Sequence, residues 1–201
     1  MPDLVPRSGL EHLVLPGRVG AATQTPGFTV ALVQERSLAA VMVRKNSHAD
    51  LAAAVNRTFG VELPTTPRIV SAGAVSFVWT GPGRWFAMSE RTPAHAFVTQ
   101  LQLQLAQLAT VIDQSDAHVL MRLSGPRVRD VLAKGVLIDL HPRAFQVGDA
   151  AVTSIAHFRA HFWQTDGTPT YEVAVMRTFA TAFWRWLLEA GAVYGVLVQD
   201  A

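Results

Sequence analysis

The sequence lacks cysteine altogether. Disulfides, thiolate zinc sites and cysteine nucleophiles are therefore excluded, and the absence fits a reducing cytoplasm. No uncharged apolar run reaches the roughly 18 residues that a membrane-spanning helix needs. Asp3, Arg7 and Glu11 come before any apolar run, which is not the pattern of a signal peptide. We expect a soluble, cytoplasmic protein with no membrane segment.

Charged residues are also scarce. They make up 16% of the 201 residues, against about 25% in ordinary soluble domains. Because a free monomer needs a polar surface, the deficit predicts that a partner covers part of it, although an alanine-rich composition could give the same low charge without a partner. The net charge is only +2, and the basic residues are spread from Arg7 to Arg185 without a dense run. This distribution does not predict nucleic-acid binding.

Hydrophobic periodicity predicts regular structure from Phe28 onward, whereas residues 1–27 predict an irregular arm. Ser47 or Asp50 is the expected cap of the first helix and Gly60 its end, while Thr92-Pro93 opens the second. The predicted strands are 28–33, 37–43, 74–80, 84–89, 118–123, 151–163 and 171–176, and the predicted helices are 49–59, 93–108, 127–134 and 179–190.

This order reads strand, helix, strand, strand, helix in each half of the chain. Such an order is that of a split βαβ or ferredoxin-like unit. We therefore predict an α+β protein of two ferredoxin-like (βαββα) halves, with mainly antiparallel sheets backed by helices. The halves are residues 28–114 and 115–201, within one compact globular unit, and no sequence repeat accompanies this duplication.

The candidate metal pair is His157 and His161. The run around them alternates with period two, which favours a strand over a helix, and residues four apart on a strand lie about 13 Å from each other. That distance is too long for one metal ion. The face that carries both histidines, Arg159 and Trp163 is expected to be either solvated or in contact with a partner.

Two other patterns are better explained as turns. Asp113 and Asp116 could form a carboxylate pair for acid–base catalysis, but this spacing before a strand is typical of turn and cap residues. The run 81–83, Gly-Pro-Gly, lacks the glycine spacing and the Lys-Ser/Thr ending of a phosphate loop, and predicts a tight turn between strands. We assign no catalytic, cofactor-binding or metal-binding residue.

Two helices have faces suited to docking. The helix 93–108 carries no formal charge, and Gln100, Gln104 and Gln107 surround Leu103 on the side opposite its apolar stripe, which predicts partial coverage by another chain. The apolar side chains of helix 179–190 span an arc of about 200°, which predicts packing on two sides. Either a partner or a second face of the same domain could supply the other side.

The segment from Arg122 to Phe145 carries the most specific pattern. It reads Leu-Ser-Gly-Pro-Arg-Val-Arg-Asp-Val-Leu-Ala-Lys-Gly over 123–135, and then Asp-Leu-His-Pro-Arg-Ala-Phe over 139–145. Together with Trp-Thr-Gly-Pro-Gly-Arg-Trp at 79–85 and Phe-Trp-Arg-Trp-Leu-Leu-Glu-Ala-Gly at 183–191, it resembles the gamma subunit of heterotetrameric sarcosine oxidase. The resemblance runs from about Phe28 to Gly195. Helix formation does not require the run 139–143, Asp-Leu-His-Pro-Arg, which we therefore interpret as an assembly feature.

The resemblance implies a subunit of a larger enzyme. That enzyme oxidises the N-methyl group of sarcosine, giving glycine, hydrogen peroxide and a one-carbon unit for tetrahydrofolate. FAD, FMN and NAD are held by its alpha and beta subunits, and zinc belongs to its delta subunit. Gamma resembles a folate-binding aminomethyltransferase domain in fold but carries no known cofactor or catalytic residue.

We therefore hypothesise a non-catalytic subunit that packs against alpha, the large folate-binding subunit. One alternative is a stand-alone tetrahydrofolate-binding aminomethyltransferase-like protein, which would need a pocket carboxylate for the pterin; the six glutamates, mostly near turns, are poor candidates. Another alternative is the equivalent subunit of a dehydrogenase for a different N-methyl amino acid.

Overall fold

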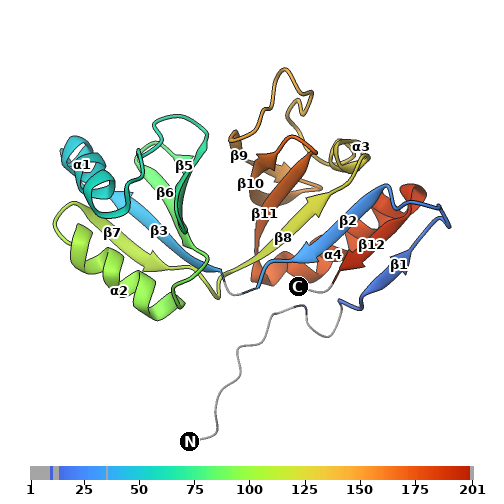
Figure 1. Ribbon diagram of the computed structural model, residues 1–201, viewed down its shortest axis with the longest axis horizontal. Helices are drawn as coiled ribbons and strands as arrows, with labels where there is room; N and C mark the ends of the chain where they lie inside the picture. Colours follow the sequence, from blue (N-terminus) through green and yellow to red (C-terminus); the bar gives the residue numbers. More distant parts are fainter. Residues whose placement is uncertain (1–9, 11–13, 35, 200–201) are drawn as a thin grey trace, which may run out of the picture.

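The computed structural model describes residues 10, 14–34 and 36–199 (Figure 1), and its strands form two sheets. The seven-stranded sheet consists, in spatial order, of β1 (Gly17–Val19), β12 (Val196–Gln199), β2 (Phe28–Leu32), β8 (His118–Ser124), β11 (Thr170–Met176), β10 (Phe158–Asp166) and β9 (Ala150–Ile155). The five-stranded sheet consists of β4 (Ile69–Ala72), β5 (Val75–Gly81), β6 (Arg84–Ser89), β3 (Ser37–Val43) and β7 (Ala109–Asp113). Among the described strands every neighbouring pair is antiparallel except β2–β12.

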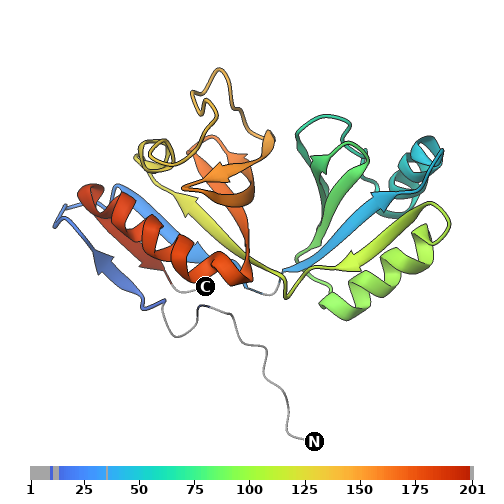
Figure 2. The same ribbon diagram turned by 180° about the vertical axis from the view of Figure 1, so that it is seen from behind.

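Helices cover the outer face of each sheet (Figure 2). The helices are α1 (His48–Phe59), α2 (Ala94–Leu105), α3 (Val128–Leu132) and α4 (Arg177–Gly191), with a short 3-10 turn, η1 (Ala192–Tyr194). The first two helices lie on the five-stranded sheet and the other two on the seven-stranded sheet, each pair over its own hydrophobic core. This arrangement confirms the predicted α+β fold. None of these helices is long and apolar enough to span a membrane.

Signals in the local sequence account for the end of α1 and for the buried face of α2. The first helix, α1, begins after Ser47 and ends at Gly60, whose φ of 69° is the left-handed conformation that glycine adopts most easily. The apolar stripe of α2 is buried on the five-stranded sheet, at Phe97, Val98, Leu101 and Leu105. Ser47 occupies the N-cap position without a side-chain capping hydrogen bond, whereas the predicted end of α1 and buried face of α2 are confirmed.

The sheets do not follow the predicted division of the chain. Although β2 belongs to residues 28–114, it lies in the seven-stranded sheet between β12 and β8, because its alternating Phe28, Val30 and Leu32 are buried in that sheet's core. The connection from β2 to β3 thus crosses between the sheets instead of closing a hairpin (Figure 1). Within the predicted arm 1–27, β1 pairs with β12. The short strands β4, β7 and β12 were not predicted either.

The predicted single strand 151–163 is a hairpin, so that prediction was wrong. The turn lies at Ala156 and His157, whose φ angles are 50° and 73°. Positive φ at two turn residues suits a tight hairpin but is usually provided by glycine or asparagine. Nothing in the run 155–158 therefore signals the turn. As a result His157 lies at the tip of the hairpin and His161 lies within β10.

The inner faces of the two sheets pack against each other. Leu38, Val78, Phe86 and Met88 of the five-stranded sheet meet Leu120, Ala150, Trp163 and Ala174 of the seven-stranded sheet. The face of β10 that carries His161 and Trp163 therefore contacts the protein's own second sheet, which corrects the expectation of a solvated or partner-facing surface. A main-chain bridge and an ion pair of 3.1 Å join Arg68 to Asp149 at one end of this contact.

Two histidines lie in this contact beside Phe86. The ring of Phe86 is 5.1 Å from that of His118 and 4.6 Å from that of His161. Burial lowers the pKa of both imidazoles, and for His161, with further lowering from His118 and Arg159, the pKa falls to about 4. Neither Nδ1 atom has a hydrogen-bond partner among the described residues.

This burial predicts acid sensitivity. His161 in the unfolded chain takes up a proton near pH 6.5, whereas the folded protein resists protonation until about pH 4. The free energy of unfolding should therefore fall as the pH drops from about 7 to 4, by up to about 3 kcal/mol, with no further loss from this group below pH 4. Urea denaturation at several pH values measures this, and His161→Phe should flatten the dependence. An unchanged pH dependence in His161→Phe, or an equal change in the exposed-site control His95→Phe, would contradict the account.

Candidate functional site

Among the described residues, one carboxylate is buried between the two sheets. Glu172 lies in the middle of β11 and is only 2% exposed. Its neighbours Tyr171 and Val173 point to the opposite side, into the core beneath α4. Since side chains alternate along a strand, Glu172 faces the other sheet.

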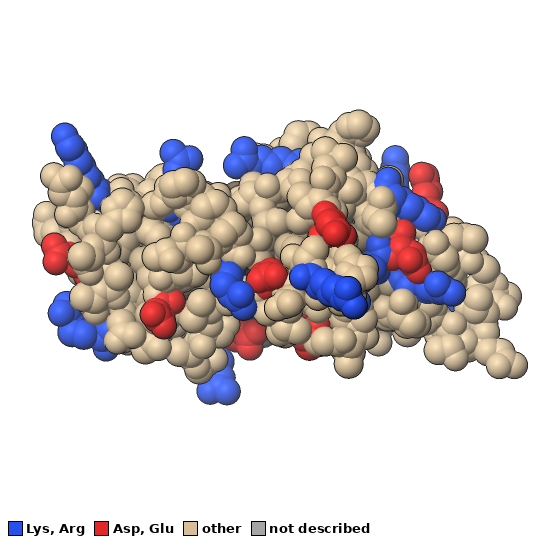
Figure 3. All heavy atoms as spheres, turned by 90° about the horizontal axis from the view of Figure 1, so that it is seen from above, with Lys and Arg blue, Asp and Glu red and all other residues tan. Residues whose placement is uncertain are grey.

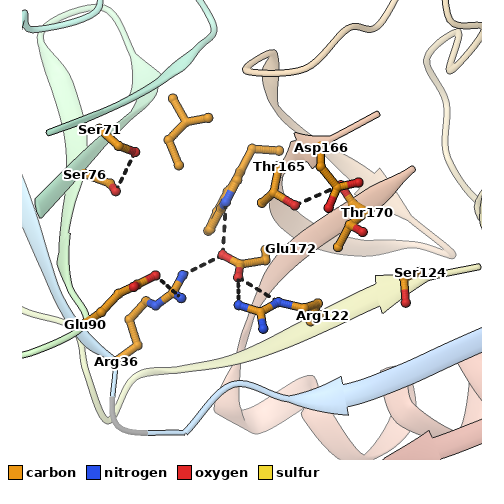
Figure 4. A pocket seen from close by; sticks show the side chains of 12 residues that line it. Arg36, Ser71, Ser76, Glu90, Arg122, Ser124, Thr165, Asp166, Thr170 and Glu172 are labelled. Atoms are coloured by element: carbon orange, nitrogen blue, oxygen red, sulfur yellow. Dashed lines mark hydrogen bonds and ion pairs between the residues drawn. The ribbon is translucent and has the colours of Figure 1, made fainter. Parts of the chain in front are cut away.

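Four hydrogen bonds satisfy this carboxylate (Figure 4). Its Oε2 accepts hydrogen bonds from Arg36 Nη1 at 2.6 Å and Trp163 Nε1 at 3.2 Å. Its Oε1 accepts hydrogen bonds from Arg122 Nη2 at 2.8 Å and Arg122 Nε at 3.3 Å. Arg36 also pairs with Glu90, at 2.7 Å. We call Glu90, Arg36, Glu172 and Arg122 the inter-sheet network.

Strand register brings these groups together. Glu172 is directly opposite Trp163 on β10 and Arg122 on β8, so the three side chains form one row across the seven-stranded sheet. Arg36 comes from the connection between β2 and β3, and Glu90 follows the end of β6. The network therefore links residues of both sheets.

The geometry of the network indicates a structural role, which is to stabilise the buried carboxylate. Burial of an unpaired carboxylate costs several kcal/mol, and charge-assisted hydrogen bonds offset this cost. Four donors occupy the four lone-pair sites of Glu172. The carboxylate therefore has no free oxygen site with which to act as a base or to bind another group.

A cleft of about 380 Å³ opens beside the network. Polar side chains dominate its wall (Figure 4), and its lining is Arg36, Ile69, Ser71, Ser76, Glu90, Arg122, Ser124, Trp163, Thr165, Asp166, Thr170 and Glu172. Burial acts to raise the pKa of Asp166, but hydrogen bonds from Thr168 and Thr170 outweigh it and hold the pKa below its usual value. Within the described part of the chain, no three histidine or carboxylate side chains gather closely enough to hold a metal ion.

The residues singled out in the sequence lie elsewhere. Asp113, the last residue of β7, accepts a hydrogen bond at Oδ1 from Ser115 N at 2.9 Å, and Asp116, in the connection to β8, pairs with Arg177 at 3.3 Å. The run 81–83 forms the tight turn between β5 and β6, as predicted. None of these residues lines the cleft.

The run 139–143 orders its own loop. Asp139 Oδ1 accepts a hydrogen bond from His141 N at 2.8 Å, and His141 Nδ1 accepts one from Arg143 N at 3.2 Å. The side chains of Leu140 and Phe145 anchor the loop in the core of the seven-stranded sheet. Its role in assembly stays a prediction.

Sequence reasoning missed the network. The available signal was a lone glutamate within the otherwise apolar run 171–176, since a buried carboxylate in a strand requires a cationic partner. The partners, Arg36 and Arg122, lie 136 and 50 residues away in the sequence. Only the register of the sheet identifies them.

The network predicts a large effect of a small substitution. Glu172→Gln leaves Glu90 as the one carboxylate that balances the two guanidinium groups of the network, and should lower the free energy of unfolding by about 3 kcal/mol. The matched control Glu189→Gln, on the exposed side of α4, should change it by less than about 0.5 kcal/mol. Urea denaturation at pH 7 measures both values. Equal effects of the two substitutions would refute a structural role for the network.

Comparison with known proteins identifies the family. The sequence model of the sarcosine oxidase, gamma subunit family matches residues 44–193. Sarcosine oxidase subunit gamma of Corynebacterium sp. strain U-96 is 35% identical over 147 residues, which cover 71% of this chain and 68% of that protein. The same subunit of Corynebacterium sp. strain P-1 is 31% identical over 194 residues, which cover 92% of this chain and 90% of that protein.

Solved structures agree in fold. A chain of heterotetrameric sarcosine oxidase from Corynebacterium sp. U-96, in complex with pyrrole 2-carboxylate, matches with a TM-score of 0.80 and 28% identity over 94% of this chain and 96% of that one. Aminomethyltransferase T of the glycine cleavage system from Bartonella henselae matches with a TM-score of 0.62 and 14% identity, over 88% of this chain and 48% of that one, and shares the fold alone. This chain therefore belongs to the sarcosine oxidase gamma subunit family.

Proposed function

We propose that this protein is the non-catalytic gamma subunit of a heterotetrameric sarcosine oxidase and that it supports assembly of the complex. The complex would convert sarcosine to glycine and hydrogen peroxide and pass a one-carbon unit to tetrahydrofolate. FAD, FMN, NAD and zinc would then be held by the alpha, beta and delta subunits. Family membership and the near full-length match to a chain of a heterotetrameric enzyme support this proposal.

The observation that carries the assembly role is the outer face of α2. The helix has no charged residue, its apolar stripe is already buried on its own sheet, and Leu103 on the opposite side is 75% exposed. A solvated helix would normally carry charged pairs at such positions. Glutamines and a leucine instead suit a surface that becomes covered without the cost of desolvating charge.

Helix α4 supports the proposal less than its sequence suggested. Phe158 of the β9–β10 hairpin lies 5.8 Å from Phe179 and 6.1 Å from Phe183, measured between ring centroids. Trp184 is buried, and Trp186 packs against the same core. The protein's own hairpin thus supplies the second packing side of α4, and only Phe179 among these aromatic side chains is strongly exposed.

The loop between α3 and β9 provides a second candidate contact. Leu137 is 79% exposed, and Ile138 and Val147 are also exposed in this loop. Hydrogen bonds of the run 139–143 order the segment that displays them. On the face shown in Figure 3, acidic and basic side chains are interspersed among uncharged ones, so it has no continuous basic patch for nucleic acid.

We expect the alpha subunit to be the direct partner, as the family resemblance implies. A stand-alone aminomethyltransferase that binds tetrahydrofolate is the rival function. It would need a carboxylate available to the pterin. The buried Glu172 already accepts four hydrogen bonds, which leaves Glu90 and Asp166 as the other carboxylates of the cleft lining. Micromolar binding of tetrahydrofolate to the purified chain would favour the rival.

The proposal predicts that a charge on the α2 face weakens assembly. Leu103→Lys should reduce recovery of this chain with the alpha, beta and delta subunits by about tenfold after coexpression, because the lysine would have to be desolvated. Size-exclusion chromatography of the tagged complex measures the recovery. The control Ala53→Lys, on the exposed side of α1, should leave recovery unchanged. Full recovery of Leu103→Lys would show that this face is not an interface, and a wild-type chain that never joins the complex would refute the proposed function.

A further inference from the structure

The inter-sheet network is a chain of alternating charges with two open ends. Its order is Glu90, Arg36, Glu172 and Arg122, joined by contacts of 2.7, 2.6 and 2.8 Å (Figure 4). The side chains of the inner members Arg36 and Glu172 are 9% and 3% exposed. Those of the outer members Glu90 and Arg122 are 62% and 50% exposed.

The outer members retain unused hydrogen-bonding atoms. Glu90 binds Arg36 through Oε1, while its Oε2 has no partner among the described residues. Arg122 uses Nε and Nη2 for Glu172, while its Nη1 likewise has none there. One open end is thus an acceptor with negative charge and the other is a donor with positive charge, and both residues line the same cleft.

The rest of the cleft suits a small polar molecule. Its volume of about 380 Å³ lies at the lower end of the range for small-molecule sites. Hydroxyl groups of Ser71 and Ser76 come from the five-stranded sheet, and those of Ser124, Thr165 and Thr170 come from the seven-stranded sheet. These groups donate and accept hydrogen bonds without adding net charge.

We propose that this cleft binds a small α-amino acid as its zwitterion. The carboxylate of the ligand pairs with Arg122 Nη1, and its ammonium group pairs with Glu90 Oε2. The ligand then closes the chain of alternating charges into a ring, whereas a simple anion or a simple cation leaves one end unpaired. This binding site goes beyond the proposed function, which gives this chain no ligand.

Because the two ends of the network lie on different sheets, a bound ligand should also affect the stability of the fold. Glu90 follows a strand of the five-stranded sheet and Arg122 lies in the seven-stranded sheet, so a bound amino acid bridges the two sheets. A ligand that binds only the folded protein raises its melting temperature. Amino acid binding should therefore raise the melting temperature of the full chain in a concentration-dependent manner.

Calorimetric titration of the full chain with glycine and with sarcosine tests the proposal. Saturable binding with a dissociation constant of about 1 mM is expected for ligands of this size. Acetate and methylamine, which each carry one of the two charges, should bind at least about tenfold more weakly. Absence of saturable binding by both amino acids up to about 50 mM, or equally tight binding of acetate, would overturn the proposal.

Two variants locate the site. Arg122→Lys keeps a cation beside Glu172 but removes the free Nη1, and Glu90→Gln keeps a hydrogen bond to Arg36 but removes the negative charge. Each should weaken glycine binding by about tenfold or more, and the exposed position of Glu90 keeps the test valid if Arg122→Lys lowers stability. The controls Arg159→Lys and Glu189→Gln lie outside the cleft lining and should bind as the wild type does. Unchanged affinity in Glu90→Gln would overturn the assignment.

Discussion

The packing of the two sheets against each other depends on one requirement: the buried carboxylate of Glu172 must keep its charged partners. Each sheet has its own helices and its own hydrophobic core, whereas the core shared between them is small. A charge at this contact tolerates burial only with its partners in place. Arg36 and Arg122 approach it from two parts of the chain, so the pairing fixes how the connection before β3 lies on the seven-stranded sheet.

The same constraint limits the chemistry that Glu172 itself can perform. A catalytic or ligand-binding carboxylate needs an oxygen that is available to the reacting molecule. Here every oxygen lone-pair site of the buried carboxylate is taken by a protein donor. Hydrogen-bonding atoms without a partner among the described residues remain at the two exposed ends of the network, Glu90 and Arg122. On the outer faces of the fold, the uncharged side of α2 and the apolar tip of the loop before β9 are exposed.

Sequence reasoning captured the local features and missed the long-range ones. The Gly60 helix end, the buried stripe of α2 and the 81–83 turn depend on residues close in sequence, and all were predicted. The transfer of β2 to the other sheet and the pairing of Glu172 with Arg36 depend on register between distant strands. The hairpin at Ala156 was missed because its residues lack the usual turn signal, so the histidines were assigned to the wrong geometry.

The assembly role is the central claim of this account, and the mass of the native complex tests it most directly. The chain can be tagged in its own cells, purified gently and examined by native mass spectrometry. We predict one copy of this chain together with three different subunits that carry FAD, FMN, NAD and zinc. A stable monomer, or a complex with unrelated proteins, would contradict the assignment of this chain as a gamma subunit that supports a sarcosine oxidase.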